Sequence, residues 1–344
     1  MHIGLIGSAR FGTDEPFAGG LEAHVATLAS HLLSRGHTVD LLPDRATAFT
    51  PSDAARRDVS SGPQVALAEH HAYLCSLLAI GQSGVQILHN HSVHYLPIAM
   101  GPALGRPMIT TLHSPPTPWL ESAFLAARGH PGTVVSVSAA NAAQWIPAVG
   151  ACGVIANGVD VERFRPGPGG GGHAAWFGRI VPEKGLDSAI AAARLAGIPL
   201  RIAGPIHDHE HFERMIRPRL GGDMTYEGHL DGPALNELVG TAEVTLVTPH
   251  WDEPYGLVVA ESLAMGTPVA AFRRGGIPEV VTEETARLVP AGDVEALARS
   301  IPEAAMLDRR ACRRHAELHC NVERMVDEYE ALYRRTVEPQ PCLR

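Results

Sequence analysis

Short apolar stretches alternate with segments of helical periodicity along most of the chain. Residues 3–6 form the first apolar stretch, and after a polar loop hydrophobic side chains recur every three or four residues at Leu21, Val25, Leu28 and Leu32. That spacing predicts one buried face of a helix. Residues 38–42 predict a second strand, so the chain begins with a strand–helix–strand unit. Such units are typical of α/β proteins with parallel sheets.

The same alternation continues to about residue 289 and restarts once on the way. Predicted strands in the first half are residues 85–88, 108–112, 133–137 and 153–156. In the second half they are residues 174–177, 200–203, 224–226, 244–247, 269–272 and 286–289. Between the halves, residues 165–172 are rich in proline and glycine and predict a disordered linker. We therefore predict two doubly wound α/β domains, residues 1–160 and 161–320, with a site between their facing strand ends.

Composition and charge narrow the classes of function. The chain has 344 residues and is 45% hydrophobic, which is enough to build full cores, and its length fits about two domains. A formal net charge of −9 argues against sequence-independent nucleic-acid binding. The five cysteines lack a C-x2-C spacing, so they indicate neither a zinc site nor a disulfide framework. Without a long apolar stretch or a basic leader, we expect a cytoplasmic protein that has no integral membrane segment.

Polar side chains follow several predicted strands of the first domain. His89 and His91 stand at the end of one strand, His113 follows the next, and Ser138 follows the one after. Because ligands of open parallel sheets collect at the carboxyl ends of the strands, we expect these side chains to line one crevice. A metal site is the alternative for the histidines, but no carboxylate accompanies them at a ligand-like spacing. We predict no metal. We expect His89, His91 and Ser138 to contact a ligand on the first-domain side of the crevice, and we call them the acceptor-side candidates because a second substrate, the acceptor, would bind there.

Residues 250–282 contain the strongest candidate for a binding site. The segment Glu253-Pro-Tyr-Gly256 opens a predicted helix that follows the strand at residues 244–247. The first N–H groups of a helix are unpaired and its dipole is positive at that end, so the helix start favours an anion. Two carboxylates, Glu253 and Glu261, lie beside it and suggest a ligand that has hydroxyls as well as phosphate. A nucleotide sugar has both.

Arg179 and Lys184 add positive charge after the first strand of the second domain. Together with the helix start at residues 256–258 they form a positively charged site that suits a diphosphate. Each charge-assisted hydrogen bond contributes about 1.5–3 kcal/mol to the binding free energy. No Asp-x-Asp pair lies in a loop suited to Mg²⁺, which favours neutralisation without a metal. Taken alone, the two basic residues fit a surface charge pair better, but beside Glu253 and Glu261 they favour a diphosphate site.

Together these segments resemble a known family over nearly the whole chain, the retaining GT-B glycosyltransferases of family four, or sucrose-synthase-like group. The strongest motif, Glu253-Pro-Tyr-Gly-Leu-Val-Val-Ala-Glu261, is similar to the family's E-x7-E signature. The other matching segments are Ala264-Met-Gly-Thr-Pro-Val, Gly275-Gly-Ile-Pro-Glu-Val, Gly19-Gly20-Leu-Glu-Ala-His-Val, His89-Asn-His91, Asn157-Gly-Val-Asp160 and Gly178-Arg-Ile-Val-Pro-Glu-Lys-Gly185. The resemblance implies a GT-B fold, with two Rossmann-like domains facing across a cleft and a last helix, within residues 321–344, that crosses back to the first domain.

The resemblance also implies roles for individual residues. Glu253 would bind hydroxyls of the donor sugar, Glu261 the ribose hydroxyls, and His113 the donor sugar near the reacting carbon, which makes His113 and Glu253 the catalytic candidates. The other donor-side residues are Gly20, Arg179, Lys184, Tyr255, Gly256, Leu257 and Val258 around the diphosphate, and Gly204, His229 and Leu230 around the base.

The reaction implied is transfer of a sugar, with retention, from a UDP-sugar rather than a GDP- or ADP-sugar to a hydroxyl of a small-molecule or oligosaccharide acceptor. No cofactor is implied. The leaving phosphate would deprotonate the acceptor hydroxyl, and a covalent role for Glu253 is the mechanistic alternative. The short form and the Ala-, Arg- and Gly-rich composition resemble members of antibiotic pathways, which suggests a natural-product acceptor, for instance of the orthosomycin type.

Two other classes of protein remain as alternatives. A nicotinamide-dependent oxidoreductase shares the paired α/β halves, but it should carry G-x-G-x-x-G with an acidic residue about twenty positions on, and neither half does. A nucleotide-sugar-binding protein without catalysis would need Arg179, Lys184 and Glu261, but it would not need His113 and Glu253.

Overall fold

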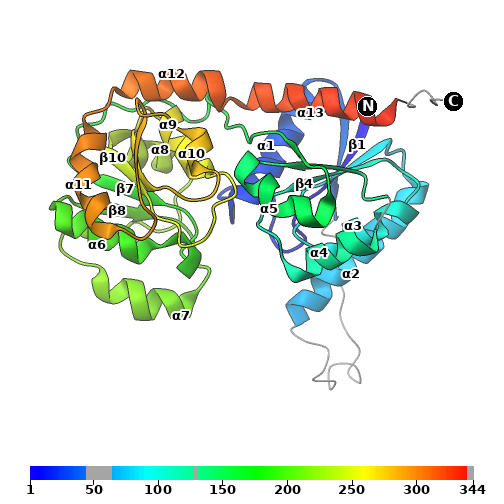
Figure 1. Ribbon diagram of the computed structural model, residues 1–344, viewed down its shortest axis with the longest axis horizontal. Helices are drawn as coiled ribbons and strands as arrows, with labels where there is room; N and C mark the ends of the chain where they lie inside the picture. Colours follow the sequence, from blue (N-terminus) through cyan, green and yellow to red (C-terminus); the bar gives the residue numbers. More distant parts are fainter. Residues whose placement is uncertain (44–63, 128–129, 339–344) are drawn as a thin grey trace.

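The computed structural model describes residues 1–43, 64–127 and 130–338, which form two α/β domains lying side by side (Figure 1). The first domain has a six-stranded parallel sheet in the order β2-β1-β3-β4-β5-β6, and the second has one in the order β12-β11-β10-β7-β8-β9. Each order reverses its direction once, between β1 and β3 and between β10 and β7. The predicted pair of doubly wound domains is confirmed.

The strand bounds follow the predicted apolar stretches closely. The strands are β1 (His2–Ile6), β2 (Thr38–Leu42), β3 (Ile87–Asn90), β4 (Met108–Leu112), β5 (Thr133–Ser136), β6 (Gly153–Val154), β7 (Ala174–Phe177), β8 (Leu200–Ala203), β9 (Met224–Tyr226), β10 (Val244–Val247), β11 (Val269–Phe272) and β12 (Ala286–Val289). The helices are α1 (Gly20–Ser34), α2 (Gln64–Ala79), α3 (Tyr95–Met100), α4 (Pro118–Ala126), α5 (Ala139–Val149), α6 (Leu186–Ala196), α7 (His209–His211), α8 (Gly232–Thr241), α9 (Leu257–Ala264), α10 (Ile277–Val280), α11 (Val294–Ala305), α12 (Arg309–His319) and α13 (Val322–Val337).

Strand β3 begins and ends two residues later than predicted. In the ladder His89 pairs with Leu5 and Asn90 with Ile6, so β3 runs on to the end of β1. Both polar residues are completely buried. The apolar pattern placed this strand end wrongly because it reports on burial by hydrophobic side chains, whereas backbone pairing decides where a strand ends.

Helices cover both faces of each sheet, as the positions along β7 illustrate. Ala175 and Phe177 face a core built with α8, α9 and α12, whereas Ala174 and Trp176 face a core built with α6 and α11. Successive residues of a strand point to opposite faces, so a fully apolar strand requires helices on both sides. In the first domain α1 and α13 cover one face, and α2, α4 and α5 cover the other.

The last two helices connect the domains in opposite ways. Helix α12 packs on the second domain, and α13 then crosses back to the first, as Figure 1 shows in orange and red. The buried face of α13 includes Tyr329 and Tyr333, which share a core with Leu5 and Leu28. The predicted crossing-back helix is confirmed, and the predicted domain boundaries near residues 160 and 320 stay a prediction.

The proline- and glycine-rich run at residues 165–172 is not a free linker. Its backbone N–H groups at Gly167, Gly169 and Gly171 donate to carbonyl groups of the second domain at 2.9–3.0 Å. A Cβ on Gly167 would overlap the backbone of Gly240. The prediction of a disordered linker was wrong here, because glycine permits a close approach between backbones as readily as it permits disorder.

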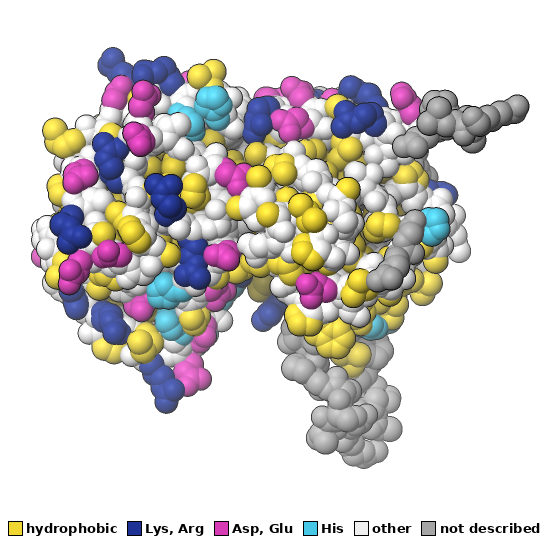
Figure 2. All heavy atoms as spheres, in the orientation of Figure 1, with side chains coloured by type: hydrophobic (Ala, Val, Ile, Leu, Met, Phe, Trp, Pro, Cys, Tyr) yellow, Lys and Arg dark blue, Asp and Glu magenta, His cyan; other side chains and the backbone are white. Residues whose placement is uncertain are grey.

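Charged side chains are unevenly spread over the surface. Figure 2 shows acidic and basic side chains interspersed over the second domain, whereas the same face of the first domain is largely hydrophobic or uncharged. No helix within the described residues is long and apolar enough to cross a membrane.

Candidate active site

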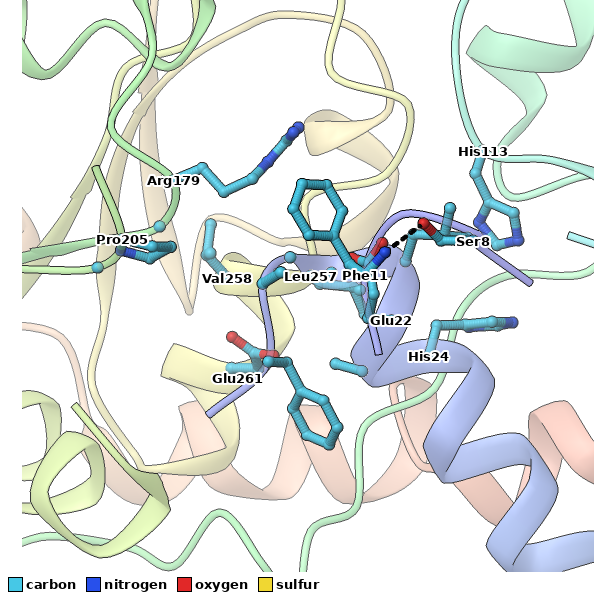
Figure 3. Close-up of a pocket in the computed structure, with 18 of the residues that line it drawn as sticks. Ser8, Phe11, Glu22, His24, His113, Arg179, Pro205, Leu257, Val258 and Glu261 are labelled. Atoms are coloured by element: carbon cyan, nitrogen blue, oxygen red, sulfur yellow. Dashed lines mark hydrogen bonds between the residues drawn. The ribbon is translucent and has the colours of Figure 1, made fainter. Parts of the chain in front are cut away.

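A cavity of about 560 Å³ lies between the domains, where the loops after β1, β3, β7 and β10 meet. These are the strands at which the two sheets reverse their order, and an open α/β sheet binds its ligand at such a point. Figure 3 shows side chains from both domains around the cavity, among them Arg179, Val258 and Glu261 from the second domain and Glu22 and His113 from the first.

Helices α1 and α9 both begin at this cavity, one from each domain. Each follows a glycine, Gly19 or Gly256, so no side chain caps its first N–H groups. Helix α8, by contrast, is capped by the carboxylate of Asp231. The two uncapped starts nearly touch, since a Cβ on Gly20 would lie 3.1 Å from the Leu257 Cδ1 atom. Two positive helix ends therefore converge on one point, which favours an anion with more than one phosphate.

Lys184 and Glu253 form an ion pair in the second-domain half of the cavity. Lys184 Nζ lies 2.6 Å from Glu253 Oε2, and the indole N–H of Trp251 donates to the same oxygen at 3.0 Å. The ammonium group also lies 5.2 Å from the centre of the Trp251 ring. Arg179 reaches the cavity beside Gly19, where a Cβ would lie 3.3 Å from Arg179 Cδ. Both predicted basic residues thus face the cavity.

Glu261 lies one turn further along α9, and its carboxyl group forms no hydrogen bond or ion pair within the described part of the chain. Burial raises the pKa of this carboxyl to about 7, and the positive charge of Arg163 opposes that shift more weakly. A carboxyl that titrates near neutral pH inside a cavity is typical of a functional site.

The predicted base site forms another wall of the cavity, at the ends of β8 and β9. Gly204, His229 and Leu230 all line it. Gly204 has a φ of 140°, and a Cβ there would clash with the carbonyl oxygen of Gly178. Only glycine permits this approach between two loops. His229 Nε2 donates to the Phe17 carbonyl oxygen at 3.1 Å, which links this wall to the first domain.

His113 lines the cavity on the first-domain side and contacts two more histidines. Its Nε2 lies 2.9 Å from Nδ1 of His91, and the centres of the His24 and His113 rings are 4.8 Å apart. Burial lowers the pKa of all three imidazoles, that of His24 to about 4, so the rings are neutral at pH 7. Neither nitrogen of His24 has a hydrogen-bond partner among the described residues.

These three histidines are also close enough together to hold a metal ion, with one nitrogen from each within 4.8 Å of the others. No carboxylate of the described residues joins the group, and the hydrogen bond between His91 and His113 already occupies one nitrogen of each ring. The arrangement therefore fits a neutral hydrogen-bonding surface better than a cation site.

The predicted acceptor-side histidines do not line the cavity. His89 is completely buried, and its nitrogens bond to the Tyr333 hydroxyl at 2.7 Å and to Thr111 Oγ1 at 2.8 Å. It therefore fastens α13 to the sheet. His91 lies behind His113 and is also fully buried. The crevice prediction was wrong for both, because the sequence does not show which strand face α13 covers.

Ser138 is a contact between domains and is not part of the cavity wall. It caps α5, and its hydroxyl donates to the Pro254 carbonyl oxygen at 2.5 Å. Beside it the Glu279 carboxylate of the second domain accepts from the N–H groups of Ala139 and Ala140 at 2.8 and 2.7 Å. The start of α5 is therefore bound to the loop that carries Glu253, and Ser138 does not lie in the crevice where the sequence placed it.

Two family models match the chain, one on each side of the cleft. The model described as Glycosyltransferase Family 4 matches residues 18–163, and the model described as Glycosyl transferases group 1 matches residues 171–317. The first match contains His113 and the start of α1, and the second contains Arg179, Lys184 and both carboxylates. The chain is a family 4 glycosyltransferase. It transfers a sugar from a nucleotide-sugar donor.

Curated relatives of the glycosyltransferase act on different acceptors. It is 27% identical to glycogen synthase of Mycobacterium tuberculosis, over 94% of each chain. It is 33% identical to the D-inositol 3-phosphate glycosyltransferase of Saccharomonospora viridis, over 47% of this chain and 45% of that protein. A shorter match, 32% identical, covers 40% of this chain and 34% of the 2-deoxystreptamine N-acetyl-D-glucosaminyltransferase of Streptomyces fradiae.

Solved structures show that the glycosyltransferase has the GT-B fold. Sucrose-phosphate synthase of Thermosynechococcus elongatus superposes with a TM-score of 0.78 at 22% identity, over 97% of this chain and 98% of that one. Anabaena HepE, solved in complex with UDP-glucose, gives 0.75 at 19% identity over 97% and 100%. AviGT4, involved in avilamycin A biosynthesis, gives 0.70 at 23% identity over 98% of each chain.

The cavity of the glycosyltransferase also contains polar residues that the sequence analysis missed. Among them are Glu22, His24, Glu69, Tyr73, His94 and Trp251. The sequence could have indicated Glu22 and His24, because they lie within about one turn of the start of a helix, and Gly20 at that start was predicted to lie near the diphosphate. Glu69 and Tyr73 come from α2, where nothing in the local sequence indicates the direction of the cavity.

Proposed function

We propose that the enzyme transfers a sugar from a UDP-sugar to a hydroxyl of a small-molecule or oligosaccharide acceptor, with retention and without a metal ion. One observation carries this proposal: a single cavity brings two uncapped helix starts and two basic side chains together with Glu253 and Glu261, opposite His113. These groups correspond to the diphosphate, the sugar and ribose hydroxyls, and the reacting carbon of a nucleotide sugar.

Donor binding replaces contacts within the protein by contacts between the protein and the donor. When the donor binds, the Lys184 ammonium group gives up part of its contact with Glu253 and binds a phosphate oxygen. Arg179 and the first N–H groups of α1 and α9 bind the rest of the diphosphate. Each such charge-assisted contact contributes about 1.5–3 kcal/mol. The ionised Glu261 accepts the ribose hydroxyls, and Gly204, His229 and Leu230 flank the base.

The leaving phosphate is the base that we assign to the acceptor hydroxyl. His113 and the neighbouring His24 have pKa values far below the usual value for histidine because burial disfavours their charged forms. Such imidazoles accept a proton poorly at neutral pH. A phosphate oxygen that departs on the same face of the sugar is a stronger base. His113 then serves as a neutral hydrogen-bond donor to the sugar.

Glu253 is assigned to binding rather than to covalent attack. Its Oε2 atom already accepts hydrogen bonds from Lys184 and from Trp251, and both contacts stabilise the anionic carboxylate. Stabilising a carboxylate in this way lowers its nucleophilicity, whereas the free Oε1 atom can accept from a sugar hydroxyl. This arrangement fits a residue that orients the donor.

Similar proteins support the choice of donor and suggest the kind of acceptor. HepE was solved with UDP-glucose, which supports a UDP-sugar here. AviGT4 and the 2-deoxystreptamine N-acetyl-D-glucosaminyltransferase support a natural-product acceptor, and hence a place in antibiotic biosynthesis. An acceptor of the orthosomycin type is the narrower form of that proposal.

The test is a panel of UDP-, GDP- and ADP-sugars scored by released nucleotide in the presence of EDTA. We expect slow release from one UDP-sugar that EDTA does not suppress. NMR of the glycosylated product should show the anomeric configuration of the donor. Inversion would contradict the mechanism, and loss of activity with EDTA would contradict metal independence.

Two variants separate this function from its alternatives. Glu253→Gln and His113→Phe should each lower the rate of nucleotide release at least about a hundredfold, with UDP affinity changed little. Release that stays at the wild-type level in both variants would indicate a binding protein with an unrelated background activity. Thermal stabilisation by NAD but not by UDP would indicate an oxidoreductase instead.

A further inference from the structure

The first-domain wall of the cavity carries polar side chains that the proposed donor does not use. They are Glu22 and His24 from α1, Glu69 and Tyr73 from α2, and His94 before α3. Figure 3 shows Glu22 and His24 on the same side of the cavity as His113. This is the wall that an acceptor meets when it approaches the reacting carbon.

Glu22 is a nearly buried carboxylate that has no partner. It is 7% exposed, and it forms neither an ion pair nor a hydrogen bond within the described part of the chain. A Cβ on Gly19 would lie 3.0 Å from Glu22 Oε2 and 3.3 Å from Arg179 Cδ, so both side chains approach the same glycine. They do not pair, and the donor diphosphate takes Arg179. A buried charge without a partner is strongly unfavourable, so a cation in the ligand would stabilise Glu22.

Glu69 places a second carboxylate on the same wall. The pKa of Tyr73 is raised to about 12, chiefly by burial and further by the negative charges of Glu69 and Glu22. Both carboxylates line the cavity, and the charges of both act on Tyr73. The Tyr73 hydroxyl itself is already committed, since it donates to the Gly7 carbonyl oxygen at 2.8 Å.

The histidines of this wall do not offset the two carboxylates. Burial lowers the pKa of His24 and of His94 to about 4, and it lowers that of His113 well below the usual value for histidine. At pH 7 all three rings are neutral and add no positive charge.

Arginine and lysine are scarce here as well. In the described part of residues 1–160, Arg10 is the one such residue that lines the cavity. Its side chain is 60% exposed, and its Nε atom is 3.9 Å from Glu69 Oε1. Glu15, a third carboxylate of the wall, is matched by Arg163 at 3.0 Å. Asp160 also lines the cavity, so this wall carries two more carboxylates than arginines.

We propose that the acceptor carries an ammonium group, as an aminocyclitol or an amino sugar does, which Glu22 and Glu69 bind while a hydroxyl of the same molecule meets the reacting carbon. This inference rests on the proposed sugar transfer and adds the chemical class of the acceptor. A phosphate ester would face two carboxylates with Arg10 as its one partner, and a neutral polyol would leave Glu22 without a counter-charge.

The transfer step leaves the ammonium group unchanged. The acceptor hydroxyl oxygen forms a bond to the anomeric carbon, the bond from that carbon to the phosphate oxygen breaks with its electron pair, and the hydroxyl proton passes to a phosphate oxygen. An ammonium nitrogen held by carboxylates has no lone pair, so transfer is directed to oxygen. Its positive charge also offsets the charge of the nearby diphosphate.

Three probes with the same six-membered carbon ring test the proposal: 2-deoxystreptamine with two amino groups, neutral myo-inositol, and anionic myo-inositol 3-phosphate. Each is titrated calorimetrically into the full chain saturated with UDP. We expect 2-deoxystreptamine to bind at least about tenfold more tightly than myo-inositol, and more weakly as NaCl increases. Equal affinity for these two probes, or tighter binding of the phosphate, would overturn the proposal.

Variants that keep the shape of the wall but remove its charge complete the test. Glu22→Gln and Glu69→Gln should each weaken 2-deoxystreptamine binding by roughly tenfold and leave myo-inositol binding unchanged. The exposed Glu162→Gln is the matched control and should change neither. UDP-glucose affinity must not fall in any variant. If the wild type does not bind UDP-glucose, the proposed function is refuted. If it binds UDP-glucose but does not discriminate among the three probes, this inference alone is refuted.

Discussion

Burial acts in opposite directions on the acids and bases of the cavity. It raises the pKa of Glu261 to about 7 and lowers that of His24 to about 4. In both cases the charged form loses its hydration, so the carboxyl retains its proton and the imidazole releases one. At neutral pH Glu261 is therefore only partly ionised and His24 is neutral in the unliganded cavity. A ligand that hydrogen-bonds to the Glu261 carboxylate would favour its ionised form.

Donor affinity should depend on the ionisation of Glu261. Because the ionised carboxylate accepts ribose hydroxyls and the protonated one competes as a donor, affinity for UDP-glucose should increase as pH rises through about 7. Below that pH the dissociation constant should rise by up to about tenfold per pH unit. Calorimetric titration between pH 5.5 and 8.5 measures this, and UDP-glucose itself does not titrate in that range.

Glu261→Gln is the control, and it should bind UDP-glucose weakly with no dependence on pH. Its stability supplies an independent check. A carboxyl whose pKa is raised on folding favours the folded state at low pH, and this contribution is lost as pH rises through about 7. The variant should therefore gain more in Tm over the wild type at pH 8 than at pH 5. A gain of equal size at both pH values would contradict the shift.

His91 should determine which nitrogen of His113 carries the proton. The Nε2 atom of His91 is buried and has no hydrogen-bond partner among the described residues, and a buried N–H without a partner is rarer than a buried acceptor without one. The proton of His91 therefore belongs on Nδ1, from which it is donated to His113 Nε2. His113 is then protonated on Nδ1, and we expect ¹⁵N NMR of the imidazole nitrogens to show this tautomer.

His91→Phe should remove that preference and yield both tautomers of His113. We expect kcat to fall by about tenfold with KM changed little, because donation to the sugar contributes mainly in the transition state. His70→Phe, outside the cavity lining, is the control. An Nε2 tautomer in the wild type would contradict the assignment.

At the scale of elements, α5 is the point where the domains are directly joined beside the donor loop. Ser138 binds the Pro254 carbonyl, and Gly276 N–H binds the Glu253 carbonyl at 2.7 Å, so the donor loop is fixed from both domains. Glu279 adds a negative charge at the positive end of α5. These contacts join the first domain to the second at the edge of the cavity.

Glu279→Ala should favour a more open arrangement of the domains. It leaves two N–H groups of α5 without their carboxylate, and loss of such a cap costs about 0.5–2 kcal/mol. We expect a larger radius of gyration by small-angle X-ray scattering and a kcat/KM reduced by about 2- to 30-fold. Glu283→Ala, at an exposed position nearby, should change neither quantity. An unchanged radius in Glu279→Ala would show that α5 does not maintain closure.

At the scale of the whole molecule, α13 makes the first domain depend on a segment far away in sequence. Its tyrosines complete the core around Leu5 and Leu28, and Arg35 of the first domain pairs with Asp327 at 2.6 Å. The chain thus enters the second domain through the run at residues 165–172 and returns along α13.

Tyr333→Ala should destabilise the first domain strongly. Loss of a completely buried aromatic ring leaves a cavity and costs about 3–5 kcal/mol, whereas Tyr333→Phe loses only the hydrogen bond to His89, worth about 1 kcal/mol. Urea denaturation followed by circular dichroism measures both. Equal effects of the two substitutions would show that the ring does not support the core.

The sequence predicted most strands correctly because their signal is local. Residues 244–247 and 269–272 form apolar stretches of strand length followed by turn residues, and such stretches have no other stable place than a sheet covered on both faces. Glu253, Gly256 and Glu261 were predictable for a related reason, because they belong to one short segment that leads into α9 and forms its first turns.

Only the tertiary structure decided the properties that depend on segments distant in sequence. It bonded His89 to α13, fixed the glycine run against the second domain, and placed Glu69 and Glu22 in the lining of the same cavity. A local pattern determines which face of an element is apolar, but not which polar groups another element brings to it. By itself the sequence therefore determined the fold and the segment that carries Glu253 and Glu261 to the cavity, whereas packing between distant segments determined which charged side chains line the first-domain wall.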